Sequence, residues 1–164
     1  SILFKIKYLQ IKMVSLQPAN NQFFRDYNHP IRKIPRANVI PNSILSVVME
    51  DPESYPFYHL AYKAGLDHIL EDTTTNYTVF VPTELQGHLD KLQSREIVKN
   101  CIYQGLVDID DMIDRPSFRL PMISKFNLKI NYPYVGLGKL VTKEPIKTIN
   151  GYIYKVDMQP TYEL

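Results

Sequence analysis

One short segment, Asn76–Thr83, constrains the fold more than any other part of the chain. β-Branched and aromatic residues fill positions Tyr77–Val81, and residues of this kind fit the pleated surface of a sheet. Pro82 then ends the run, because proline has no N–H to donate to a strand ladder. The segment therefore predicts a short, mostly buried strand with an abrupt exit.

A second segment, Asn150–Pro160, combines a turn with a strand. Asn150-Gly151 is a strong tight-turn signal, and the alternation that follows it predicts a strand. The two segments are similar to the signature strands of the fasciclin-type domain. Asn76–Thr83 resembles a family motif close to Thr-Val-Phe-Ala-Pro-Thr, and Asn150–Pro160 resembles Asn-Gly-Val-Ile-His-Val-Ile-Asp followed by a proline. Ala64-Gly65-Leu66 is similar to the family turn that precedes the first strand, so the resemblance covers about residues 43–164.

The resemblance implies an α+β fold, a fasciclin-like β-wedge of short strands with helices packed on one side. It also implies an adhesion or protein-interaction module that has no catalytic residues and no cofactor. The chain departs from the family at Glu84-Leu85-Gln86-Gly87, where the family continues with an acidic residue and an Ala-Phe pair. Gln104 and Tyr154 stand where the family has histidines, which puts any function tied to those histidines in doubt.

Hydrophobic periodicity and capping residues predict the other elements of the domain. Asn42 or Ser43 caps the first helix, Asp51-Pro52 ends it, and Gly65 ends the second. The predicted helices are Ile44–Val48, Pro56–Ala64, Leu66–Leu70 and Ser94–Tyr103, and the predicted strands are Asn127–Ile130 and Lys139–Val141, with Gly136 and Gly138 in the turn between them.

Residues 1–42 differ from the remainder in charge. They carry seven basic residues and one acid, a net charge of +6, whereas the remainder carries 12 basic and 16 acidic residues, a net charge of −4. Four prolines favour extended backbone in this stretch. We predict an extended basic N-terminal arm over residues 1–42, followed by a domain over residues 43–164. Within the arm, Ile2–Tyr8 alternates as a strand that adds to a sheet edge or forms a frayed end.

The candidate interaction residues are charged and aromatic side chains of the arm and of an acidic segment. Asp108–Asp114 lacks the glycine and terminal glutamate of a calcium-binding EF-hand loop, so it is either a solvated turn or a dock for a basic partner such as the arm of a neighbouring copy. The candidates are Lys5, Lys7, Lys12, Phe23, Phe24, Arg32, Lys33, Arg36, Tyr103, Asp108, Asp110 and Asp111.

The sequence contains no convincing catalytic or metal-binding pattern. Glu84 and His88 supply two ligands at most, fewer than a zinc site needs. Cys101 lies on an apolar stripe, where a free cysteine behaves as a small core residue. Gly136-Leu137-Gly138 lacks the rest of a phosphate-binding loop. We therefore predict no metal and no cofactor, and we predict that the protein is not an enzyme.

Two functions fit these features. The first is a structural protein that its arm holds in a larger assembly. Its partners would be other proteins of that assembly, and self-association is a further option. The specific form of this function is a minor capsid component in the virion of a large DNA virus. This choice follows from the absence of a visible signal peptide or membrane span, from Ser1 as the residue left after removal of an initiator Met, and from a composition that suits an AT-rich genome.

The alternative is a secreted or cell-surface adhesion domain, in which the sequon Asn76-Tyr77-Thr78 would carry a sugar. The single cysteine excludes an internal disulfide but does not exclude secretion. The charges of the arm are too sparse to predict a nucleic-acid interface. An enzyme has only scattered histidines, one cysteine and carboxylates in its favour.

Overall fold

The computed structural model describes residues 38–85 and 90–160. The chain divides into two compact units, and one of them, Asn38–Thr83 with Leu89–Leu164, holds almost all of the described residues. This unit is the body described below. The predicted division at residue 42 remains a prediction.

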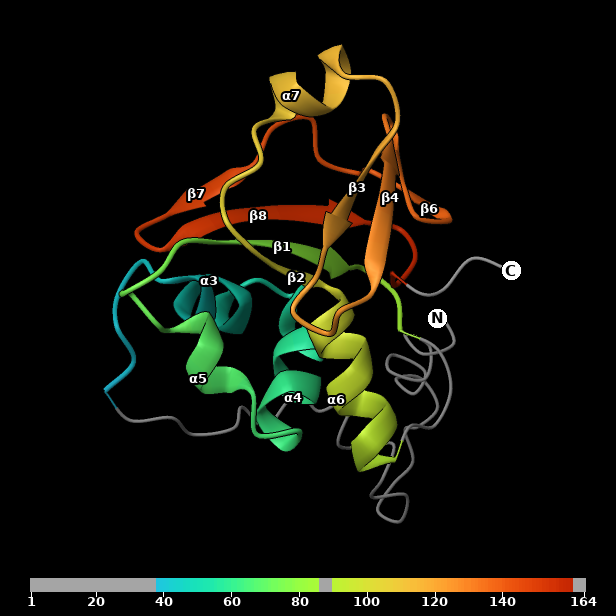
Figure 1. The fold of residues 1–164 in the computed structure, drawn as a ribbon. Helices are drawn as coiled ribbons and strands as arrows, with labels where there is room; N and C mark the ends of the chain where they lie inside the picture. Colours follow the sequence, from blue (N-terminus) through green and yellow to red (C-terminus); the bar gives the residue numbers. More distant parts are fainter. Residues whose placement is uncertain (1–37, 86–89, 161–164) are drawn as a thin grey trace. The chain divides into compact units, whose positions relative to one another are not determined.

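The first sheet is built around two parallel strands from the two signature segments (Figure 1). β1, Tyr77–Pro82, is buried at every position, and it pairs in parallel with β8, Gly151–Val156. The outer strands are β2, Ile102–Gln104, beside β1, and β7, Ile146–Thr148, beside β8. Because both faces of β1 are covered, its sequence is apolar nearly throughout rather than strictly alternating.

Four helices pack on one side of this sheet (Figure 1). They are α3, Ile44–Glu50; α4, Tyr55–Lys63; α5, Asp67–Leu70; and α6, Lys91–Asn100. Ser43 caps α3, and Asp90 forms a capping box with Gln93 at the start of α6. The buried side chains of these helices include Ile44, Leu45, Val48, Phe57, Tyr58, Ala61 and Val98.

A second, antiparallel sheet and helix α7, Ile109–Asp114, cover the other face of the first sheet (Figure 1). Its strands are β3, Phe118–Pro121; β4, Asn127–Asn131; β5, Tyr134–Val135; and β6, Gly138–Lys139, hydrogen-bonded in that order. The core between the two sheets contains Phe80, Met112, Met122, Leu128, Ile130, Val135, Tyr154 and Val156. The α+β architecture with helices on one side is thus confirmed, with α7 as the exception.

Three local predictions were wrong. The predicted helix Ser94–Tyr103 is shifted: α6 begins at Lys91 and ends at Asn100, and Ile102 opposite Val79 belongs to β2. The acidic turn is a helix, α7. The predicted strand Lys139–Val141 is shorter, because β6 ends at Lys139 and Leu140 makes only an isolated bridge to Val156.

Candidate interaction site

Acidic side chains project from the beginning and the end of α7. Asp108 precedes the helix without capping it through its side chain, Asp110 and Asp111 lie in the first turn, and Asp114 is the last helical residue. All four are exposed, whereas Met112 in the middle of the helix is buried in the core. We call these four residues the α7 acidic surface. The structure thus brings together three of the predicted interaction residues, Asp108, Asp110 and Asp111.

Two tyrosines of β8 lie beside this acidic surface. A hydrogen bond with Asp108 raises the pKa of the Tyr152 hydroxyl, and the Lys147 ammonium lies 5.8 Å from the centre of the Tyr152 ring. Tyr154 is fully buried, donates to the Val107 carbonyl at 2.6 Å and stacks on Phe80 with a centroid distance of 5.6 Å. Burial, and secondarily the charge of Asp108, raises the Tyr154 pKa. Tyr154 therefore serves as a core residue that holds the segment before α7.

The segment between β2 and α7 is positioned by Thr78. The Thr78 hydroxyl donates to the Gly105 carbonyl at 2.8 Å and accepts from the Val107 N–H at 3.1 Å. Tyr103, a predicted interaction residue, is half-buried and packs against the core between the sheets. Its ring lies against Gly105, where an added Cβ would be 2.8 Å from a ring carbon. Tyr103 is thus a half-buried residue packed against the core and against Gly105.

A basic face that sequence reasoning missed lies on the outer side of the second sheet. Leu128 and Ile130 point into the core, so the alternate residues of these strands point outward. Arg119 on β3 is the direct cross-strand partner of Lys129 on β4, and Tyr134 on β5 is the partner of Lys139 on β6. We call the outward residues Arg119, Lys129, Tyr134 and Lys139 the basic sheet face. Alternation of polar and apolar residues in Asn127–Asn131 was the available signal, but the pairing register cannot be derived from it.

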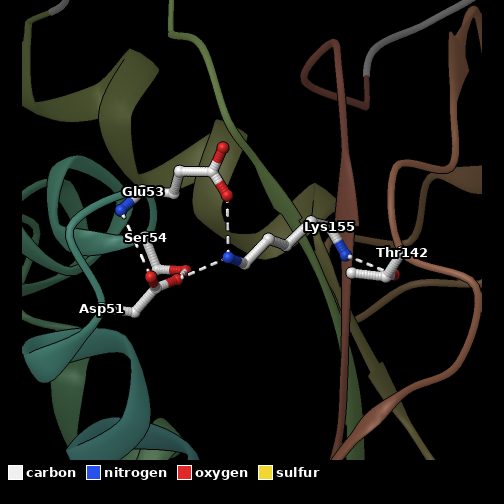
Figure 2. A network of polar contacts seen from close by, with 5 residues as sticks. All are labelled: Asp51, Glu53, Ser54, Thr142 and Lys155. Atoms are coloured by element: carbon white, nitrogen blue, oxygen red, sulfur yellow. Dashed lines mark hydrogen bonds and ion pairs between the residues drawn. The ribbon is translucent and has the colours of Figure 1, made fainter.

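An ion-pair network at the edge of the core joins the α3–α4 junction to β8 of the first sheet (Figure 2). Lys155 Nζ lies 2.9 Å from Asp51 Oδ2 and 2.8 Å from Glu53 Oε1, and the Lys155 side chain is only 14% exposed. Ser54 donates to Asp51 at 2.6 Å, and the Lys155 N–H donates to the Thr142 hydroxyl at 3.2 Å. The network fixes the junction of α3 and α4 on β8, so it is structural.

Burial and partners compete in setting the pKa values of this network. Burial alone would raise the pKa of Asp51, but the hydrogen bonds from Ser54 and Lys155 and the charge of Lys155 lower it below its usual value. Burial alone would lower the pKa of Lys155, but its contacts with Glu53 and Asp51 raise it.

The other predicted residues fall into two groups. Lys5, Lys7, Lys12, Phe23, Phe24, Arg32, Lys33 and Arg36 lie outside the described residues, as does His88. Cys101 is fully buried at the end of α6, and burial raises its thiol pKa. Within residues 38–85 and 90–160, no three His, Cys, Asp or Glu side chains are arranged to hold a metal ion. Across the same ranges, no helix is long and apolar enough to cross a membrane.

Comparison with known proteins identifies the fold. No family profile and no curated protein matches the sequence. Among solved structures, the chain is similar to a FAS1 domain pair from the insect cell adhesion molecule fasciclin I, with a TM-score of 0.55 and 14% sequence identity. The similarity covers 75% of this chain and 51% of that chain, so this chain spans about half of its length. The fasciclin-like fold expected from the two signature strands is therefore confirmed.

Proposed function

We propose that this chain is a non-enzymatic interaction module, held in a larger assembly by its basic N-terminal arm. The observation that carries the proposal is the separation of charge: residues 1–42 have a net charge of +6, and the remainder has −4. The exposed carboxylates of the α7 acidic surface add a place where a basic partner can bind. Similarity to a domain pair from a cell adhesion molecule supports a binding role over a catalytic one.

The end of the predicted arm is bonded to the body. The Ile40 N–H donates to Glu71 Oε2 at 3.1 Å, and the Asn42 carbonyl accepts from the Ile149 N–H at 2.9 Å. Ser43 then caps α3 directly after these contacts. An arm bound to other proteins would therefore hold the body through a defined attachment.

The specific form of the proposal is a minor capsid component of a large DNA virus, located in the virion or in an intracellular assembly. It rests on the charged arm and on a composition that suits an AT-rich genome. The partners in this role are other proteins of the same particle, bound through residues 1–42.

Exchange of the arm charges tests this function. The variant Lys5→Ser/Lys7→Ser/Lys12→Ser/Arg32→Ser/Lys33→Ser/Arg36→Ser should lose its partners in a co-purification from the native setting, while its circular dichroism stays unchanged. A matched control replaces an equal number of body lysines outside the basic sheet face: Lys63, Lys91, Lys99, Lys125, Lys143 and Lys147. Retention of every partner by the arm variant would contradict the proposal.

A second candidate is a secreted or surface adhesion domain. Asn76 of the sequon is exposed at the start of β1, so a sugar there would meet no packed neighbours. Thr78 of the same sequon is buried and bonded to the Gly105–Val107 segment, so the sugar would have to be added before folding. A mass shift on glycosidase treatment of the native protein, absent in Asn76→Gln, would favour this candidate.

A further inference from the structure

We propose that the basic sheet face docks the α7 acidic surface of a second copy of this chain. The contact goes beyond the proposed function, because it is made by the body alone and does not use the arm. It would join copies head to tail, since the two surfaces are different parts of the molecule.

The basic sheet face carries positive charge that nothing in the described structure balances. Arg119 and Lys129 are directly opposite each other, and like charges in that position destabilise a sheet. The described strands β3–β6 contain no acidic residue. Asp157 is close, but its Oδ1 accepts the Lys139 N–H at 2.8 Å and so bonds to backbone. An anionic partner would relieve the repulsion between Arg119 and Lys129.

The α7 acidic surface has the complementary property. The ion pairs of Lys155 with Asp51 and Glu53 do not involve the four carboxylates near α7, and none of these four has a cationic partner among the described residues. Arg115 follows Asp114 directly, yet its guanidinium lies 3.9 Å from the centre of the Phe118 ring. Among residues 38–85 and 90–160 there are therefore two surfaces of opposite sign that do not neutralise each other.

Exposed apolar side chains accompany both charged surfaces. Ile113 of α7 is 49% exposed and Leu106 before it 47%, while Tyr134 is 48% and Leu137 53% exposed at the β5–β6 end of the second sheet. Apolar contacts surrounded by charged groups are the usual anatomy of a protein–protein interface. A single-stranded nucleic acid would use the cations and Tyr134, but it would leave Leu106, Ile113 and the acidic surface unused. These features together favour a second copy.

The test is sedimentation velocity of the full chain at low and at high salt. Self-association should be present at low salt and should weaken as salt screens the charges. Arg119→Glu/Lys129→Glu and Asp110→Lys/Asp111→Lys should each weaken self-association by about tenfold or more, because each places like charges opposite one another. The two variants mixed together should associate again, since every contact between them is then complementary. Lys63→Glu/Lys91→Glu, the same charge change on the helical side, should leave association unchanged.

Three results would overturn the proposal. One is a chain that stays monomeric at every salt concentration. Another is failure of the two charge-reversed variants to restore association when mixed. The third is binding of a fluorescent single-stranded oligonucleotide that depends on Arg119 and Lys129 without self-association. The arm variant described above separates this contact from the proposed function. If the arm variant loses its partner proteins but still self-associates, the result supports the contact made by the basic sheet face. If only the arm variant loses self-association, the acidic surface binds the arm instead.

Discussion

Gly151 lies directly against the backbone of Tyr77, so that an added Cβ would overlap the Tyr77 carbonyl group. The two residues are partners at the start of the parallel pair β1 and β8. Gly151 also has φ +154°, a conformation that side-chain-bearing residues rarely adopt. The closest approach of the two signature strands therefore depends on the absence of a side chain at this position.

Gly151→Ala should lower the free energy of unfolding by about 2–4 kcal/mol, through overlap and an unfavourable φ acting together. Gly65→Ala is the matched control, because Gly65 also has positive φ, +75°, but an added Cβ meets nothing within 4 Å. Gly65→Ala should lower the free energy of unfolding by only about 1 kcal/mol. Urea unfolding followed by circular dichroism measures both variants, and equal losses would show that the contact with Tyr77 is not the cause.

Asn150 bonds three backbone groups far from it in sequence. Its Oδ1 accepts the Ile44 N–H at 2.8 Å, and its Nδ2 donates to the Leu70 and Asp72 carbonyls at 3.1 and 3.0 Å. Asn150→Ala should cost about 2–4 kcal/mol of unfolding free energy, because these groups lose their partner in the interior. Asn150→Asp should cost at least as much, since a carboxylate beside two carbonyls cannot donate to them. Thermal unfolding of both variants measures the effect, and a change below about 0.5 kcal/mol for either would contradict this role.

Tyr154→Phe isolates the hydroxyl that holds the segment before α7. The variant keeps the stack on Phe80 but loses the bond to the Val107 carbonyl. We expect a loss of about 1–2 kcal/mol in unfolding free energy, and faster amide exchange in residues 105–108. Hydrogen exchange that is unchanged in this segment would contradict the assigned role.

The Lys155 network predicts a pH-dependent contribution to stability. The pKa of Asp51 is lowered from 3.8, so its contribution is present above that pH and is lost as the pH falls through the folded-state pKa. The pKa of Lys155 is raised from 10.5, so its contribution is present below that pH and is lost as the pH rises through the folded-state pKa. Lys155→Met should therefore lower stability most between about pH 4 and pH 10. Denaturant unfolding over pH 2.5–11 measures the difference, and a constant difference across this range would refute the prediction.

The parts of the fold that were predictable are those that depend on local sequence. β1 is mostly apolar because both faces of the first sheet are covered, Ser43 caps α3, and Gly65 follows the end of α4 with positive φ. The end of α6 was not predictable, because Ile102 continues the helical pattern and only pairing with Val79 makes it a strand. The strands β3, β5 and β7 are two to four residues long, too short for a periodic signal.

The candidate site was predictable only in part, for the same reason. The acidic residues around α7 are adjacent in sequence, so their clustering is visible without a structure. The basic sheet face is assembled by cross-strand register, because Arg119 and Lys129 are ten positions apart and face one another only in the folded sheet. The role of Tyr154 as a core residue likewise depends on Phe80 and Val107, which are remote in the chain.

The central claim is that the arm binds other proteins while the body remains folded. Chemical cross-linking of the protein in its native setting, followed by mass spectrometry, tests it most directly, because Lys5, Lys7 and Lys12 belong to the proposed arm and react with amine-specific reagents. The account predicts that these lysines form cross-links to one or two other proteins in stoichiometric amounts. Cross-links from the arm to this chain's own body alone, with no other protein present, would contradict it.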